Sequence, residues 1–175
     1  LREEAAEVIA MLRKLGIKRI YLLSGDNKGA TERIARTLGA DGFRGALLPR
    51  EKTDLVKALK AMGCVVAMVG DGMNDSPAMS AADVGIAMKD GADLAQSVAD
   101  ITLKDPSLYP LVIARLMSER AIKRIRGNTV AAIGINGALT FMSLFGNITT
   151  TSSVWLHNLA TLAVSLNSMR PLVKE

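Results

Sequence analysis

Two carboxylates and an amide stand close together on a glycine-containing turn near the middle of the chain. The turn runs Gly70-Asp71-Gly72-Met73-Asn74-Asp75 and follows the apolar run 64–69, which predicts a buried parallel strand. Ligands collect at the carboxyl ends of such strands in open α/β sheets. Mg²⁺ binds through one or two carboxylates together with substrate phosphate. Asp71 and Asp75 are therefore candidate magnesium ligands. The alternative is an acidic turn with Asp75 as the N-cap of a helix.

Two further polar groups follow earlier predicted strands. Ser24-Gly25-Asp26 comes after strand 18–23 and offers a hydroxyl, a free N–H and a carboxylate at a helix start, which is an anion site. Lys52 lies early in a helix after the short strand 43–47 and could neutralise a phosphoryl group. Taken singly, these residues have simpler explanations, as a helix N-cap at Ser24 or Asp26 and a solvated lysine. Their order, one group after each successive strand, favours a phosphoryl site.

Helical periodicity and short apolar runs alternate over the first hundred residues. This alternation predicts an α/β fold with a Rossmann-like parallel sheet covered by helices on both faces. We expect helices over 2–15, 28–38, 51–62 and 76–81, and strands over 18–23, 43–47, 64–69, 84–87 and 100–103. Four glycines follow predicted helices as C-caps would: Gly16, Gly39, Gly42 and Gly63.

A long stretch without formal charge distinguishes the second part of the chain. Residues 127–169 contain no Asp, Glu, Lys or Arg, and two transmembrane helices of about 20 residues each need that length. We expect spans over Thr129–Phe145 and Ser153–Met169, and a buried soluble hairpin is the alternative. The predicted parts are an α/β domain over 1–106, a basic helix over 107–127, a transmembrane hairpin over 128–170 and a tail over 171–175.

Basic residues flank the uncharged stretch and contribute to the net charge of +5. By the positive-inside rule, both flanks are expected in the cytoplasm and the hairpin in membrane lipid. Nucleic acid is not expected as a partner, because only 3% of residues are aromatic and no recognition motif accompanies the charge. The single cysteine, Cys64, falls in an apolar run, which argues against disulfides and thiolate metal sites and predicts a small core residue.

Three motifs together resemble the second half of the phosphorylation domain of P-type ATPases, which belong to the haloacid-dehalogenase-like superfamily. They are Ser24-Gly25-Asp26-Asn27, Leu48-Pro49-Arg50-Glu51-Lys52 and Gly70-Asp71-Gly72-Met73-Asn74-Asp75-Ser76-Pro77-Ala78-Met79. The last is highly specific, and Ser24 replaces the threonine most often seen in the family. The resemblance covers essentially the whole chain. It implies a haloacid-dehalogenase-type parallel sheet, part of a phosphorylation domain, that runs directly into a transmembrane helical hairpin.

The resemblance also implies residue roles and the cofactors Mg²⁺ and ATP. Asp71 would coordinate the metal with support from Asp75, Asn74 would contact the phosphoryl group, and Lys52 would stabilise its charge. The implied catalytic residues are Lys52, Asp71, Asn74 and Asp75, and the implied phosphate- or nucleotide-binding residues are Ser24, Gly25, Asp26 and Gly72.

Part of the family's machinery is absent from this sequence. The family's nucleophilic aspartate sits in an Asp-Lys-Thr-Gly-Thr run, and no such run occurs among the 175 residues. The nucleotide-binding and actuator domains and the earlier membrane helices are absent as well. The sequence therefore resembles the C-terminal fragment of a pump, inactive alone and dependent on the remainder of the pump as a partner.

Polar residues on one face of the second predicted span are candidates for contact with a transported ion. His157, Asn158 and Thr161 share this face by their spacing, and imidazole is a good ligand for zinc, cobalt, nickel or copper. The stretch from His157 to Thr161 resembles a motif of heavy-metal P-type ATPases in which glutamate often follows the histidine. Asn158 departs from this motif, so the identity of the transported metal stays open. The alternative is interhelical hydrogen bonding, which is the favoured interpretation for Ser165 and Asn167.

The implied function is ATP-driven transport of a heavy-metal cation across a membrane through an aspartyl phosphate. The expected location is the plasma membrane, with the α/β part in the cytoplasm. Two alternatives stay open: a membrane-anchored phosphatase of the same superfamily and a non-catalytic membrane fragment. The phosphatase would need its own nucleophilic aspartate near the amino terminus, and no Asp precedes Asp26.

Overall fold

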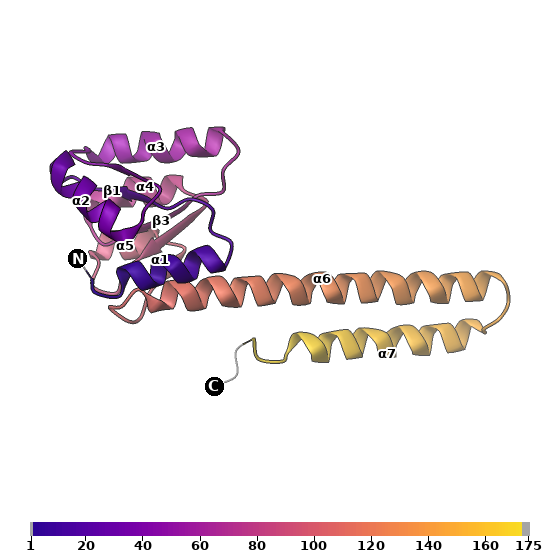
Figure 1. Ribbon diagram of the computed structural model, residues 1–175. Helices are drawn as coiled ribbons and strands as arrows, with labels where there is room; N and C mark the ends of the chain where they lie inside the picture. The colour runs from indigo at the N-terminus through magenta and orange to yellow at the C-terminus, as the bar shows by residue number, and fades with distance from the viewer. Residues whose placement is uncertain (1, 173–175) are drawn as a thin grey trace. The chain divides into compact units, whose positions relative to one another are not determined.

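The chain folds into two units, Leu1–Ala114 and Arg115–Glu175. The computed structural model describes residues 2–172. In the first unit helices and strands alternate (Figure 1), and the structure adds one helix that the sequence analysis does not predict, between the last two strands. Its elements are α1 (Ala5–Lys14), β1 (Tyr21–Leu23), α2 (Lys28–Leu38), β2 (Gly42–Arg44), α3 (Pro49–Ala61), β3 (Ala67–Gly70), the 3₁₀ turn η1 (Met73–Asp75), α4 (Ser76–Ala81), β4 (Val84–Ala87), α5 (Asp93–Val98) and β5 (Ile101–Thr102).

The strands form two parallel sheets instead of a single sheet. β1 pairs with β2, with Tyr21 opposite Gly42, and β4 lies between β3 and β5. Among residues 2–172, no ladder joins β1 to β3, so each of these strands has one unpaired edge. Val65, just before β3, is 88% exposed, and Tyr21 is 41% exposed. Strands of parallel sheets normally bury apolar side chains. Val65 and Tyr21 are therefore exposed because no element of the described chain packs over them at the unpaired edges of β1 and β3.

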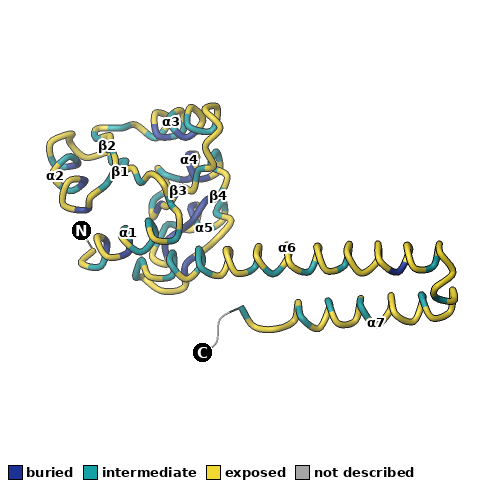
Figure 2. The backbone as a smooth tube through the Cα atoms, turned by 45° about the vertical axis from the view of Figure 1, so that its right-hand side comes forward, coloured by how far each residue is buried: buried dark blue, intermediate teal, exposed yellow. Residues whose placement is uncertain are grey.

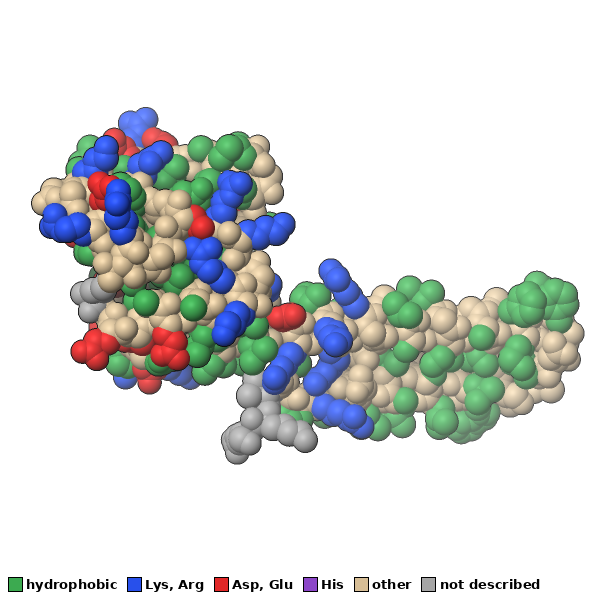
Figure 3. All heavy atoms as spheres, viewed as in Figure 1, with side chains coloured by type: hydrophobic (Ala, Val, Ile, Leu, Met, Phe, Trp, Pro, Cys, Tyr) green, Lys and Arg blue, Asp and Glu red, His purple; other side chains and the backbone are tan. Residues whose placement is uncertain are grey.

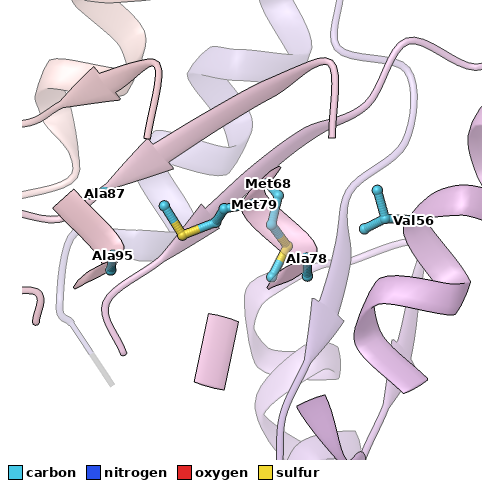
Figure 4. Packing of buried hydrophobic residues seen from close by; sticks show 6 residues of the cluster. All are labelled: Val56, Met68, Ala78, Met79, Ala87 and Ala95. Carbon is cyan, nitrogen blue, oxygen red and sulfur yellow. The ribbon is translucent and has the colours of Figure 1, made fainter. Parts of the chain in front are cut away.

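The core of the first unit lies between helices α3, α4 and α5 and the β3–β4 pair (Figures 2 and 4). Met79 of α4 is 1% exposed and Val56 of α3 is 2% exposed. Burying a side chain of this size contributes about 1.5–3 kcal/mol. This packing anchors α4, whose first residue follows the Asp71–Asp75 turn. The core residues are Val56, Met68, Ala78, Met79, Ala87 and Ala95.

Cys64 is exposed, so its predicted place in the core is wrong. The Cys64 N–H donates to the Leu59 carbonyl at 3.1 Å, and the Gly63 N–H donates to the Lys60 carbonyl at 2.9 Å. These two bonds, with a φ of 80° at Gly63, close the end of α3 in the manner of a Schellman motif. Cys64 therefore completes a helix end, and β3 begins three residues later at Ala67.

The second unit is a hairpin of two long helices, mostly exposed (Figure 2). α6 (Tyr109–Leu144) begins in the first unit, and α7 (Thr150–Ser168) follows a turn at Gly146, whose φ is 71°. Asn167 Nδ2 donates to Asn128 Oδ1 at 2.7 Å, which confirms the interhelical bond predicted for Asn167. The same prediction for Ser165 is wrong, because its hydroxyl donates to the Thr161 carbonyl within α7.

No helix within residues 2–172 is both long and apolar enough to cross a membrane. The predicted spans Thr129–Phe145 and Ser153–Met169 lie within α6 and α7 apart from one terminal residue each. The helices therefore form, but their transmembrane character is not confirmed. The prediction rested on the absence of charge, and uncharged Asn, Thr and Ser side chains lower the hydropathy of both segments.

One aromatic residue stands out in the hairpin. Trp155, the single tryptophan of the chain, lies in α7 and is 70% exposed. The two tyrosines, Tyr21 and Tyr109, lie in the first unit.

Candidate functional site

The Asp71–Asp75 turn follows directly on β3 and leads into α4, as the sequence predicts. A Cβ atom on Gly70 would lie 2.6 Å from the Cβ atom of Asp75. Glycine at this position therefore lets Asp75 pack against the end of the strand. The Asp71 carbonyl oxygen accepts a hydrogen bond from the Ala92 N–H at 2.9 Å. That bond ties the turn to the segment that precedes α5.

Lys52 and Asp75 form an ion pair between α3 and this turn. Lys52 Nζ lies 2.7 Å from Asp75 Oδ1, and the two side chains are 10% and 14% exposed. Lys52 is therefore not the solvated lysine of the simpler interpretation. Asp75 does occupy the N-cap position of α4, but its carboxylate makes no capping hydrogen bond. Because either charge alone would be costly to bury, the pair holds both side chains in place.

The loop after β1 is held to the loop after β2. The Ser24 carbonyl accepts from the Leu47 N–H at 3.1 Å. Ser24 Oγ donates to Asp26 Oδ2 at 2.9 Å and accepts from the Asp26 N–H at 3.1 Å. The N-cap of α2 is Asn27, whose side chain accepts from the Ala30 N–H at 2.8 Å. Ser24 and Asp26 are thus not the N-cap, and the simpler interpretation of these two residues is wrong.

The structure joins four of the predicted site residues in two pairs, Lys52 with Asp75 and Ser24 with Asp26. The Asp71 and Asn74 residues are exposed. Across residues 2–172, no three His, Cys, Asp or Glu side chains gather as a ready metal site. Mg²⁺ does not require such a cluster, since it keeps several waters and binds through one or two carboxylates. The exposed Asp71 carboxylate, on the same short turn as Asp75, fits this mode of binding.

The three ion candidates of α7 do not form a cluster of their own. Thr161 Oγ1 donates to the His157 carbonyl at 3.0 Å, a bond within the helix, and Asn158 is exposed. The His157 ring instead contacts α6, where its Nδ1 lies 2.8 Å from Asn136 Oδ1. Both residues line an open groove of about 410 Å³, together with Leu139, Thr140, Ser153 and Val154.

Two residues at these sites carry features that the sequence analysis missed. Asn136 pairs with His157, and only the register of the hairpin shows this; the one signal in the sequence is an asparagine inside the charge-free stretch 127–169. Ser76, next to Asp75, has a buried hydroxyl oxygen for which the described part of the chain provides no hydrogen-bond partner. A serine in the first turn of a helix is common, so its sequence position carries no signal.

Comparisons with known proteins identify relatives of this chain. Residues 1–83 match the family model described as a haloacid dehalogenase-like hydrolase. Over 171 residues, 97% of the chain, the sequence is 40% identical to the manganese-exporting P-type ATPase of Mycobacterium leprae and to the zinc-exporting P-type ATPase of Mycobacterium marinum. A crystal structure of a zinc-transporting PIB-type ATPase in the E2.Pi state matches 99% of the chain with a TM-score of 0.92 and 38% identity.

The chain spans about a quarter of the length of these relatives: 24% and 23% of the two curated proteins and 28% of the crystallised one. Its fold and the family match over residues 1–83 identify an α/β domain of the haloacid-dehalogenase-like type. Within that class, its homologues are the heavy-metal P-type ATPases. The resemblance predicted from the three motifs is therefore confirmed.

Proposed function

We propose that this chain is part of a pump that uses ATP to move a heavy-metal cation across a membrane through an aspartyl phosphate. The observation that carries the proposal is the nearly buried ion pair that joins Lys52 of α3 to Asp75, which lies on the same turn as Asp71. Phosphoryl transfer depends on positioned positive charge of this kind. By their names, the relatives export manganese or zinc, which favours a divalent transition metal as cargo.

In this proposal Asp71 and Asp75 hold Mg²⁺, which offsets the negative charge of the phosphoryl oxygens when bound. The Lys52 ammonium adds a second positive charge at the same place. Its ion pair with Asp75 fixes the position of that charge before substrate arrives. Fixed charges of this kind avoid reorganisation during the reaction and are a large part of catalysis.

The loop after β1 supplies neutral donors. Ser24 Oγ–H and the Gly25 N–H are proposed to donate to phosphoryl oxygens, while Asn74 contacts the same group and Asp26 lies near the nucleotide. Gly72 leaves room for the substrate to approach the turn. Since the Ser24 hydroxyl donates to Asp26 in this structure, phosphoryl binding requires that hydroxyl to rotate away from Asp26.

The nucleophilic aspartate is proposed to come from a strand outside these 175 residues that inserts between β1 and β3. Support comes from the unpaired edges of β1 and β3 within the described residues and from the exposure of Val65. A parallel strand at this position would end beside the Asp71–Asp75 turn. The isolated chain is accordingly expected to be inactive, and the remainder of the pump is its obligatory partner.

The hairpin is proposed to belong to the membrane part of the pump, in the plasma membrane, with the α/β unit in the cytoplasm. Large apolar side chains are exposed on both helices, among them Val130 at 72%, Leu144 at 79% and Leu159 at 66%. Figure 3 shows green hydrophobic side chains along the hairpin and a group of blue Lys and Arg side chains at one end of it. Because neither helix is apolar enough to cross a membrane by itself, other helices of the pump would have to cover their polar faces.

The first test replaces Asp71 by Asn in the complete pump. Loss of a magnesium ligand should lower the level of phosphoenzyme formed from labelled ATP by at least about 100-fold. Asp54→Asn, which neutralises an exposed carboxylate on α3, is the matched control and should leave the level unchanged. Normal phosphoenzyme in Asp71→Asn at saturating Mg²⁺ would refute the assignment.

The second test measures ATPase activity of the same pump against Zn²⁺, Mn²⁺, Co²⁺, Cd²⁺ and Cu⁺. Stimulation by one or two of these ions, with an acid-stable phosphoenzyme, is expected. Hydrolysis of small phosphoesters without stimulation by any ion would instead favour the anchored phosphatase. Absence of both activities would favour the non-catalytic membrane fragment.

A further inference from the structure

The contact between His157 and Asn136 differs from the other polar contacts of the hairpin. Asn136 offers its carbonyl oxygen Oδ1 to His157 Nδ1 at 2.8 Å. A carbonyl oxygen only accepts hydrogen bonds, so the ring nitrogen that faces it must carry the proton. A neutral imidazole has one proton to place, and its other nitrogen, Nε2, then keeps a free lone pair.

The surroundings leave this lone pair available. Among residues 2–172, the structure gives Nε2 of His157 no hydrogen-bond partner. The groove that His157 and Asn136 line has Thr140 and Ser153 as its other polar residues. The second asparagine contact of the hairpin differs, because both ends of the Asn128 amide are hydrogen-bonded. Asn128 accepts from Asn167 and donates to Ser168, each at 2.7 Å.

The donor set of the groove selects a class of ion. Its side chains supply one imidazole and neutral amide and hydroxyl oxygens, and residues 127–169 contain no carboxylate and no cysteine. Calcium and magnesium favour carboxylate-rich oxygen sites. Cu⁺ favours thiolate and thioether sulfur, whereas imidazole suits Zn²⁺ and its neighbours in the first transition row.

We propose that Asn136 is a positioning residue for His157, fixing the tautomer in which Nε2 can bind a divalent cation of the zinc type. The proposal deepens the proposed transport function and rests on it for the physiological cargo. Partners that hold the second nitrogen of a metal-binding histidine fix its tautomer and orientation, and their loss costs about 10–100-fold in metal affinity. Asn136 would act in this way although it need not touch the ion.

The test uses the 175-residue chain in detergent micelles with ¹⁵N-labelled histidine. Because the chain contains a single histidine, ring nitrogen signals in the spectrum come from His157 alone. We expect the Nδ1–H tautomer in the wild-type chain and its loss in Asn136→Ala. Asn136→Asp keeps an acceptor oxygen and should retain the tautomer, while Asn128→Ala removes the other asparagine contact and should leave it unchanged.

Titration with Zn²⁺ alone provides the second readout. The wild-type Nε2 signal should shift on binding, and Asn136→Ala should raise the zinc dissociation constant by about 10–100-fold, with Asn128→Ala as the control. An Nε2–H tautomer in the wild-type chain would overturn the proposal. So would a tautomer and zinc affinity that are the same in Asn136→Ala as in the wild-type chain.

These readouts require no ATP turnover, so they are independent of the phosphoenzyme test. A fixed tautomer with zinc binding supports the role of Asn136 even where the complete pump shows no metal-stimulated hydrolysis. A normal phosphoenzyme cycle, together with an unchanged His157 tautomer and zinc affinity in Asn136→Ala, would instead refute the role of Asn136. The proposed pump function would be unaffected by that result.

Discussion

Lys52 and Asp75 are nearly removed from solvent, so each charge depends on the other. Lys52→Met would leave the Asp75 carboxylate buried without its partner, which should lower the free energy of unfolding of the 175-residue chain by about 3 kcal/mol. Urea denaturation followed by circular dichroism measures this loss. Lys57→Met, at an exposed position of the same helix, is the matched control.

The double variant Lys52→Met/Asp75→Leu separates the ion pair from simple packing. Removing both charges together should recover much of the stability that Lys52→Met loses, because no unpaired charge remains buried. If the double variant is instead as unstable as the sum of the two single variants, the pair contributes through shape and not through charge.

At this same scale, residue type and order along the chain predicted where the candidate side chains lie in the fold. Lys52, Asp71 and Asp75 all lie at strand ends or helix starts as expected. What the sequence could not predict is which of them touch. The partner of Lys52 is 23 residues away, and the partner of His157 is 21 residues away on another helix. Such distances depend on packing, and no local pattern encodes them.

At the scale of elements, two aspartates brace the strands of the first unit. Asp41 Oδ2 accepts from the Ile20 N–H at 2.7 Å and pairs with Arg13, and Asp83 Oδ2 accepts from the Val66 N–H at 2.8 Å, while its Oδ1 lies 3.1 Å from Lys60 Nζ. The backbone N–H and then the neighbouring cation hold the pKa of each carboxyl below its ordinary value of 3.8.

These lowered pKa values predict a specific acid sensitivity. A carboxyl whose pKa is lower in the folded than in the unfolded chain stabilises the fold above its ordinary value, and this stabilisation is lost as the pH falls through the folded pKa. The free energy of unfolding should therefore fall below about pH 4. Urea denaturation at several pH values should show a shallower fall for Asp41→Asn/Asp83→Asn. An identical slope would mean that other carboxyls cause the acid loss.

Glycine signals predicted most helix ends but not all. Gly16, Gly39 and Gly63 have φ values of 84°, 66° and 80° and confirm their predicted place after helices. Gly42 is the exception, since it lies in β2 opposite Tyr21. A Cβ atom there would be 2.7 Å from Tyr21 Cε1. A glycine in the sequence can indicate either the end of a helix or a close approach of another residue. The sequence alone does not distinguish these two cases, so the prediction for Gly42 is wrong.

At the scale of the whole molecule, the broken sheet is the feature that sequence patterning could not predict. Helices and strands alternate regardless of whether each strand finds a neighbour, so periodicity predicts the α/β class and not the pairing. The hairpin shows the same limit, because the absence of charge predicted two helices while their hydropathy depends on every polar side chain.

The unpaired strand edges predict a difference in hydrogen exchange between the chain and the complete pump. Amides of β1 and β3 that have no partner within the described residues should exchange rapidly in the 175-residue chain. Insertion of a strand between them should slow this exchange by about 100-fold or more. Exchange is read by mass spectrometry of peptides that cover 21–23 and 67–70.

Strand β4 serves as the internal control for that measurement, since it pairs with β3 on one side and β5 on the other. Its amides should be protected to a similar extent in both samples. Equal exchange of β1 and β3 in chain and pump would show that these edges stay open and that the nucleophile reaches the site in another way.

The position of the single tryptophan gives the molecule two separate optical signals. Trp155 stands exposed on the hairpin, whereas Tyr21 and Tyr109 belong to the first unit. Emission excited at the red edge of indole absorption therefore reports on the hairpin alone, and tyrosine signals report on the unit that carries the proposed phosphoryl site. Melting of the two parts can be followed in one cuvette without any added label.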